Sequence, residues 1–261
     1  MNASQSAEQF HAQLASYVPL FSPEYWPVWL VMAGVLLVVM WLVLGLHAWL
    51  RFRAVRKVAA AHGEKVYLYS KAVRLWHWSN ALLFILLLAS GLINHFSLVS
   101  PLVTKSVLAV HEICGFMLLA CWVGFVLINA LGGNGHHYLI QPHGWLARAK
   151  KQTRFYLYGI LQGDAHPFPA TPRAKFNPLQ QAAYVGVMYG LLPLLLLSGL
   201  LSLYPQATGD VLPGVRYWLL QAHFALAIVS LFFIFGHLYL CTTGRTPGET
   251  FRCMVDGYHR H

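Results

Sequence analysis

The sequence predicts an all-α integral membrane protein, built as a bundle of five transmembrane helices. Hydrophobic residues make up 57% of its 261 residues and charged residues only 10%, against about 25% charged residues in typical soluble domains. Five apolar runs are long enough to cross a hydrocarbon core about 30 Å thick. No internal repeat is evident, so we expect one membrane domain over residues 1–261. Its predicted transmembrane helices cover residues 27–49, 78–96, 107–131, 179–204 and 217–242.

The basic residues predict how these helices are oriented. Of the 18 Lys and Arg residues, seven lie in the loop 50–77, six lie in the loop 132–178 and three follow the fifth helix. Only Lys105 and Arg216 lie on the other side. By the positive-inside rule, both basic loops and the C-terminus are cytoplasmic, and the N-terminus is periplasmic. This orientation accounts for the net charge of +10, which therefore gives no reason to expect a nucleic-acid partner.

Local sequence supports each predicted helix in turn. The first ends in Trp49-Leu-Arg-Phe-Arg, a stop-transfer pattern with an interfacial tryptophan. The second opens with Arg74-Leu-Trp-His-Trp, and a turn around Pro101 leads into the third. Residues 148–154 predict a surface helix in the long loop, which ends in closely spaced prolines that exclude regular structure. The fourth helix follows Asn177-Pro178, and the fifth carries two histidines on one apolar stretch.

These two histidines, His223 and His237, are the most informative residues in the chain. Fourteen residues of α-helix bring both rings to nearly one face, about 21 Å apart along the axis. One imidazole therefore lies near each edge of the hydrocarbon core, where imidazole is costly and usually functional. The pattern indicates axial ligands for two haems, one in each leaflet. Helix packing through hydrogen-bonded histidines is the plainer alternative.

Two further histidines lie at depths that match this pair. A six-coordinate haem needs two imidazoles at the same depth on facing helices. His77, at the start of the second helix, matches His237, and we expect this inner pair to ligate one haem iron. His111, inside the outer end of the third helix, matches His223, and we expect this outer pair to ligate the second. His95 competes with His111, although it lies at the extreme outer end of its helix and should be shallower.

The cysteines give no sign of other metal chemistry. Cys114, Cys121, Cys241 and Cys253 form no C-x-x-C pair and no C-x-x-C-H motif. The spacing therefore supports neither covalent attachment of a c-type haem nor a cysteine-ligated iron–sulfur cluster or zinc ion. We expect these residues to act as small apolar packing groups.

The order of the histidines resembles that in the membrane cytochrome b subunits of respiratory molybdoenzymes and nickel–iron hydrogenases. In that family four helices carry one, one, no and two haem ligands, and His77, His111, His223 and His237 match this order, with one extra helix at the N-terminus. Three segments are similar, more narrowly, to the cytochrome b subunits of enterobacterial thiosulfate reductases. They are Tyr67-Leu-Tyr-Ser-Lys-Ala-Val-Arg-Leu-Trp-His-Trp-Ser-Asn-Ala-Leu-Leu-Phe, Gln152-Thr-Arg-Phe-Tyr-Leu-Tyr-Gly-Ile and Met254-Val-Asp-Gly-Tyr-His-Arg-His.

The resemblance implies a quinol-oxidising anchor subunit with two haems b, surrounded by lipid in the bacterial inner membrane. Menaquinol from the membrane pool would be oxidised near the inner haem, and electrons would cross to the outer haem. They would then pass to a periplasmic iron–sulfur subunit and a molybdopterin subunit that reduces thiosulfate. This chain would carry no thiosulfate-reducing site and no catalytic residue of its own. Polarity and depth make Asn129, Asn134, His136 and His137 the candidates for the quinol pocket.

Other functions stay open on the residues alone. The same arrangement of haem ligands would also suit the cytochrome b subunit of a formate dehydrogenase or a nickel–iron hydrogenase, which delivers electrons to quinone. A stand-alone cytochrome b would exchange electrons with soluble carriers. A haem-free transporter would use the buried histidines as proton relays. His136 and His137 also have a plain interpretation, as a polar pair at the membrane interface.

Overall fold

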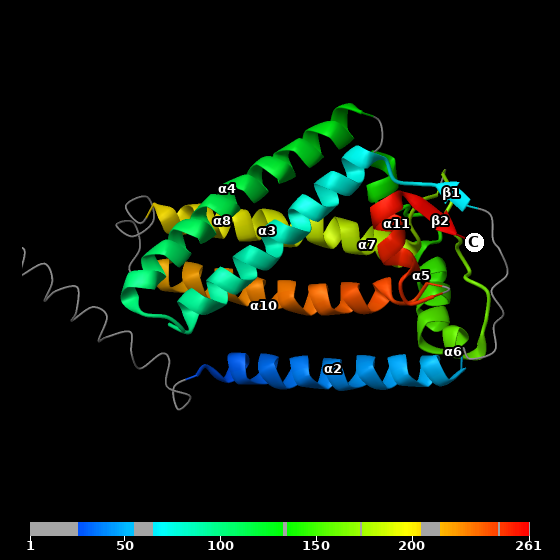
Figure 1. Ribbon diagram of the computed structural model, residues 1–261, viewed down its shortest axis with the longest axis horizontal. Helices are drawn as coiled ribbons and strands as arrows, with labels where there is room; N and C mark the ends of the chain where they lie inside the picture. The colour runs from blue at the N-terminus through cyan, green and yellow to red at the C-terminus, as the bar shows by residue number, and fades with distance from the viewer. Residues whose placement is uncertain are drawn as a thin grey trace, which may run out of the picture.

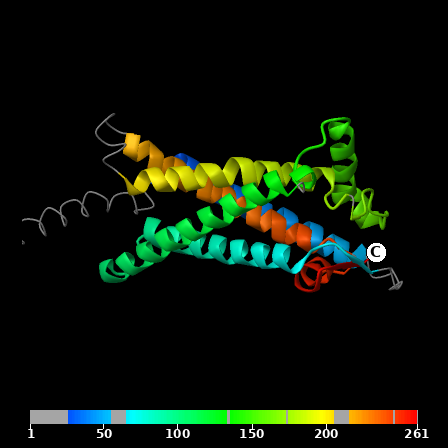
Figure 2. The same ribbon diagram turned by 90° about the horizontal axis from the view of Figure 1, so that it is seen from above.

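The computed structural model describes residues 26–54, 65–132, 135–172, 174–204, 215–244 and 246–260. Within these ranges, five helical segments are long and apolar enough to cross a membrane, as the sequence predicts. Figures 1 and 2 show them running side by side along the long axis of the molecule. The five segments are α2 (Val28–Ala54), α3 (Lys71–His95), α4 (Pro101–Leu131), the segment Pro178–Leu203 and α10 (Val215–Cys241).

The helices α3 and α4 begin earlier than their apolar runs. Ser70, in an extended conformation, caps α3 by accepting a hydrogen bond from the backbone N–H of Val73 at 3.4 Å. Pro101 occupies the first turn of α4, where a backbone N–H would have no intrahelical partner in any case. Both helices therefore begin several residues before the transmembrane segments predicted to start at residues 78 and 107.

The fourth membrane segment is not one uninterrupted α-helix. It consists of α7 (Pro178–Gly186), the π-helical turn η6 (Val187–Leu191) and α8 (Leu192–Leu203). Asn177 and Gln180 begin α7 with a reciprocal capping box. Pro193, in the first turn of α8, has no N–H to donate to the preceding turn, which accounts for the wider turn there.

Two helix pairs make up the bundle. The helix α3 packs chiefly on α4, and α8 packs chiefly on α10. Tryptophans add hydrogen bonds across helices: Trp76 Nε1 donates to the carbonyl of Cys121 at 3.2 Å, and Trp122 Nε1 donates to the carbonyl of Met188 at 2.7 Å. A shared core joins α3, α4 and the fourth segment through Leu83, Cys114, Leu118, Phe125, Met188 and Leu192.

The helix α2 lies at the edge of the bundle, where it contacts α10 and the short helix α6 (Ile160–Gln162) (Figure 1). The ring of Trp41 meets that of Phe235 edge-on, with centroids 5.0 Å apart. Nearer the C-terminal end of α2, His47 Nδ1 shares a hydrogen bond with the hydroxyl of Tyr239. These contacts attach the additional N-terminal helix to the helix that carries His223 and His237.

Short elements close one end of the bundle, which we call the capped end. The helix α5 (Trp145–Arg154) confirms the surface helix predicted at residues 148–154. The all-α prediction is confirmed, and the structure adds one short antiparallel ladder of β1 (Lys65–Tyr67) and β2 (Tyr258–Arg260). Strands of three residues so far apart in the sequence carry no local strand signal. The remaining elements of the capped end are η5 (Phe155–Gly159), α6 and α11 (Glu249–Asp256).

Candidate functional site

The inner pair of histidines meets between α3 and α10, toward the capped end. The rings of His77 and His237 have centroids 6.3 Å apart and planes inclined at 44°. Within the described chain, the buried Nδ1 of His77 has no hydrogen-bond partner. Cys241 places its Sγ 3.7 Å from Nε2 of His237.

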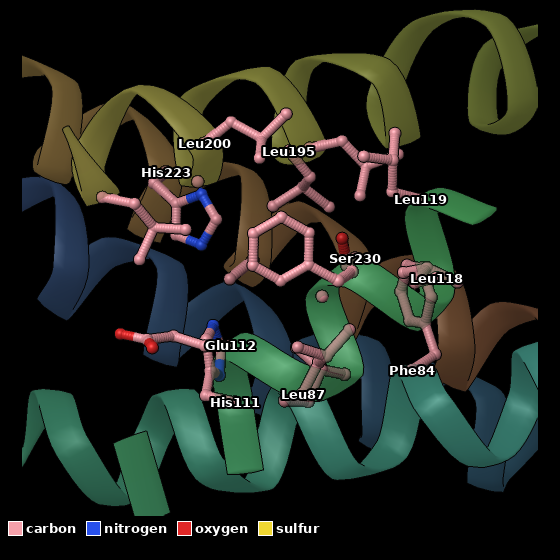
Figure 3. A pocket seen from close by; sticks show the side chains of 17 residues that line it. Phe84, Leu87, His111, Glu112, Leu118, Leu119, Leu195, Leu200, His223 and Ser230 are labelled. Carbon is pink, nitrogen blue, oxygen red and sulfur yellow. The ribbon is translucent and has the colours of Figure 1, made fainter. Parts of the chain in front are cut away.

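The outer pair meets between α4 and α10, nearer the other end of the bundle. The centroids of the His111 and His223 rings are also 6.3 Å apart, and their planes are inclined at 73°. Both rings line one cavity, and Figure 3 shows them facing each other across it. The structure thus brings together the same two pairs that the sequence predicts from depth.

The spacing within each pair fits a metal ion between the rings. An imidazole nitrogen lies about 2.0–2.1 Å from a first-row metal ion and roughly 1.1 Å from its own ring centre, so two rings on opposite sides of one ion have centres roughly 6.3 Å apart. Both pairs have that separation. Among the described residues, no three His, Cys, Asp or Glu side chains gather to hold an ion by themselves. Two axial imidazoles per site suit haem, because the porphyrin supplies the other four ligands.

The cavity beside the outer pair is apolar. It has a volume of about 120 Å³. Leucines from α3, α4 and α8 line much of it, and Figure 3 shows Leu87, Leu119, Leu195 and Leu200 around the space. The lining therefore suits a flat apolar group held by two imidazoles.

A serine holds each ring of the outer pair. Nδ1 of His111 lies 2.8 Å from Oγ of Ser90 on α3, and Nδ1 of His223 lies 2.9 Å from Oγ of Ser198 on α8. A glycine follows each serine. A Cβ added at Gly91 would lie 3.3 Å from Cε1 of His111, and one at Gly199 would lie 3.3 Å from Cε1 of His223.

These contacts reveal a repeat that the sequence analysis missed. Residues 86–93 read Leu-Leu-Leu-Ala-Ser-Gly-Leu-Ile, and residues 194–201 read Leu-Leu-Leu-Leu-Ser-Gly-Leu-Leu. Each Ser-Gly pair packs against a histidine of the helix that its own helix chiefly contacts. Leucine-rich stretches are common in membrane helices, so only the shared Ser-Gly pair could have signalled this repeat.

His95, the competitor of His111, and His47 on α2 take other positions. The ring of His95 stacks on Phe224 of α10, with centroids 3.4 Å apart and planes inclined at 10°. The ring of His47 bonds to Tyr239 and lies 3.3 Å from the carbonyl oxygen of Leu157, so it ties α2 to its neighbours. His111, rather than His95, faces His223.

The proposed quinol residues lie at the end of α4 nearest the capped end. Asn129 is buried, and its amide donates to the carbonyl of Phe125 at 2.8 Å. The rings of His136 and His137 lie 3.9 Å apart in the 3₁₀ turn η4 (Gly135–Tyr138). Burial, with neighbouring His136 and Lys175, lowers the pKa of His137, so its ring stays neutral at physiological pH. Asn134 lies outside the described residues.

Aromatic rings connect this end of α4 to the inner pair. The ring of Tyr138 meets Phe125 at 5.2 Å, and Phe125 stacks on Trp76 at 5.0 Å. Trp76 directly precedes His77 in α3. A chain of ring contacts therefore runs from Tyr138, which follows His137, to the residue before His77.

The capped end also contains polar groups that the sequence-based prediction did not identify. Gln152 and Gln181 are buried, and each leaves its amide oxygen without a hydrogen-bond partner among the described residues. Burial raises the pKa of Tyr69, of Tyr138 and of Tyr156, so their hydroxyls stay protonated. The only signal was that Tyr69, Gln152 and Tyr156 fall within two of the segments that carry the family resemblance.

Comparison with known proteins gives two matches. The family model described as "Prokaryotic cytochrome b561" matches residues 68–257. A protein of Escherichia coli (strain K12), described as "Putative cytochrome YdhU", is 78% identical over 261 residues, which is 100% of both chains. No solved structure matches.

Proposed function

Since the chain belongs to the prokaryotic cytochrome b561 family, it is a multi-pass cytochrome of the bacterial inner membrane, and we propose that it holds two haems b and oxidises menaquinol. The observation that supports this proposal most strongly is the arrangement of four histidines in two pairs, each with ring centroids 6.3 Å apart. In this proposal His77 and His237 ligate the inner haem iron, and His111 and His223 ligate the outer one. Haem supplies one-electron transfer, and the protein supplies ligation, orientation and a low-dielectric surrounding.

The placement of the pairs suits transfer across the membrane. His223 and His237 are fourteen residues apart on one continuous helix, a rise of about 21 Å. The helix α10 contributes a ligand to both sites, so it fixes their separation. With the capped end in the cytoplasm, as the basic residues predict, electrons would move from the inner to the outer side.

The capped end offers the groups that a quinol needs. The unpaired amide oxygens of Gln152 and Gln181 would accept hydrogen bonds from the two hydroxyls of menaquinol. His137, neutral because burial lowers its pKa, would accept a proton as the quinol is oxidised. The thiol of Cys241, with Sγ 3.7 Å from Nε2 of His237, adds a polar group beside the inner pair.

We further propose thiosulfate reductase as the complex that this subunit serves. The support is the similarity of residues 67–84, 152–160 and 254–261 to the cytochrome b subunits of those enzymes. Partner subunits with iron–sulfur clusters and molybdopterin would take the electrons on the periplasmic side. Outward electron movement runs down the inside-negative membrane potential, at about 2.3 kcal/mol per electron per 100 mV. That contribution would help to drive an unfavourable reduction.

The test is a reconstitution of the complex purified from membranes with its native partners. We expect a menaquinol analogue to reduce the haems and thiosulfate to reoxidise them. Gln152→Leu with Gln181→Leu should raise the KM for the quinol and leave both haems in place. Reduction by formate or hydrogen, with no effect of thiosulfate, would replace the thiosulfate proposal by a dehydrogenase or hydrogenase. A preparation without haem would overturn the proposal as a whole.

A further inference from the structure

The hydroxyl groups of Ser90 and Ser198 settle which nitrogen of each outer histidine carries the proton. Each hydroxyl has one hydrogen to donate, and each donates it to a backbone carbonyl of its own helix, that of Leu86 or of Leu194, at 2.7 Å. The serine oxygen can then only accept from the imidazole. Nδ1 of His111 and of His223 is therefore the protonated nitrogen, and the lone pair lies on Nε2.

A second backbone carbonyl supports the same assignment. The Ser90 hydroxyl also lies 3.2 Å from the carbonyl oxygen of Leu87, and the Ser198 hydroxyl lies 3.1 Å from that of Leu195. A carbonyl oxygen can only accept, so the hydroxyl hydrogen stays within its own helix and the serine oxygen presents a lone pair to Nδ1. The arrangement is the same on α3 and on α8, although the two histidines belong to different helices.

The inner pair lacks this arrangement. The buried Nδ1 of His77 has no hydrogen-bond partner among the described residues. The polar neighbour of the His237 ring is the thiol of Cys241, at 3.7 Å from Nε2, and a thiol is a weak partner. The serine contact therefore distinguishes the outer site from the inner one.

We propose that Ser90 and Ser198 are positioning residues of the outer haem. Each accepts the Nδ1–H of an axial histidine, and so holds the ring with Nε2 toward the iron. An acceptor at Nδ1 also increases the basicity of the ligating nitrogen, which favours the ferric over the ferrous iron. The two serines thus lower the reduction potential of the outer haem. The proposal rests on the ligation of that haem by His111 and His223.

Gly91 and Gly199 complete the arrangement. Each lies beside its serine, and a Cβ there would come within 3.3 Å of Cε1 of the same ring. The missing side chain lets the ring approach the helix closely enough for Nδ1 to reach the serine oxygen. The Ser-Gly pair therefore acts as one unit on each side of the outer haem.

The test compares Ser90→Ala, Ser198→Ala and the double variant with the unchanged protein. In a redox titration we expect the midpoint potential of the outer haem to rise in each variant, most in the double, and that of the inner haem to stay. Haem affinity should fall, by about 10- to 100-fold for a lost outer-shell partner. Ser90→Thr and Ser198→Thr keep the hydroxyl and should restore the potential. Electron paramagnetic resonance gives a second readout, because the signal depends on the 73° between the ring planes.

Ser202→Ala is the matched control. Ser202 lies one turn after Ser198, and its hydroxyl donates to the Ser198 carbonyl at 2.7 Å, so it has the same helix-internal bond without the histidine. Its removal should leave both potentials unchanged. An outer haem with unaltered potential and resonance signal in the alanine variants would overturn the positioning role. If His111→Ala leaves two haems in the protein, the ligand assignment fails instead, which separates the two outcomes.

Discussion

At the scale of single residues, the outer site depends on two glycines as much as on its histidines. A methyl group at Gly199 would leave only 3.3 Å to Cε1 of His223, a distance that the ring can accommodate only by shifting a few tenths of an ångström. We expect Gly199→Val, with two further methyl groups, to displace the ring and to remove the outer haem while the inner haem stays. Haem content measured against protein checks this. Gly190→Ala, where an added Cβ meets nothing within 4 Å, is the control, and an intact outer haem in Gly199→Val would contradict the expectation.

His137 gives the quinol site a pH dependence. Its lowered pKa means that the ring loses its proton at a lower pH than the usual value of about 6.5. The neutral, proton-accepting form therefore predominates down to below that pH. We expect the rate of menaquinol oxidation to stay constant as the pH falls to about 6.5 and to decline only below that pH.

The variant His137→Gln separates this dependence from other acid effects. It should slow menaquinol oxidation by about 10²-fold, as for a lost general base, and abolish the acid limb of the profile. His143→Gln, in the exposed part of the same loop, should change neither. A profile that His137→Gln leaves unaltered would assign the proton to another group.

At the scale of elements, the C-terminal segment fastens the start of α3, the helix of His77. The ladder pairs Tyr67 with Tyr258, and the backbone N–H of Leu68 donates to the carbonyl of Gly257 at 2.9 Å. Trp78 Nε1, next to His77, donates to the carbonyl of Met254 at 2.8 Å. The segment that follows α10 therefore returns to the inner site and holds its second ligand helix in place.

Gly257 is the residue on which this attachment depends most. Its φ of 87° suits glycine, and a Cβ would lie 2.6 Å from the carbonyl oxygen of Tyr69. We expect Gly257→Ala to destabilise the segment by about 1–3 kcal/mol and to release the inner haem at a lower temperature than the outer haem. Thermal loss of each haem, followed by absorbance, measures this. Gly163→Ala has a similar φ of 80° but open space, so it isolates the strain from the clash. Equal effects of the two variants would show that the clash is unimportant.

The elements were predictable to the extent that hydrophobicity defines them. Apolar length located five helices, and helix periodicity placed His223 and His237 on one face. Apolar length did not locate the starts of α3 and α4, because Ser70 and Pro101 lie outside the apolar runs; as an N-cap serine and a first-turn proline, they were the local signals for these starts. The ladder and the serine contacts depend on residues far apart in the sequence, and no local pattern specifies such contacts.

At the scale of the whole molecule, the basic residues and the capped end lie together. The helix α5 carries Arg148, Lys150, Lys151 and Arg154, and α11 and the ladder lie at the same end (Figure 1). A reporter that is active only in the cytoplasm should therefore work at the C-terminus, and one active only in the periplasm should work at the N-terminus. The reverse result would put the inner pair on the periplasmic side and remove the contribution of the membrane potential to the reaction.

The sequence predicted the pairing of the four histidines better than it predicted the polar residues of the quinol site. Depth alone paired His77 with His237 and His111 with His223, and the structure brings the same rings to 6.3 Å. The quinol residues were chosen by polarity, and Asn129 uses its amide within its own helix. Gln152 lies on α5 and Gln181 on α7, and these two helices pack together only in the folded chain. The sequence therefore did not single out their buried amide oxygens.

The central claim is that these two pairs of histidines hold two haems, and counting haems tests it most directly. Reduced-minus-oxidised spectra and haem content would be measured for the unchanged protein and for His111→Ala, His237→Ala and His95→Ala. We predict two b haems in the unchanged protein, one fewer in each of the first two variants, and no loss in His95→Ala. Two haems in His111→Ala, with one lost in His95→Ala, would contradict the assignment of the outer site.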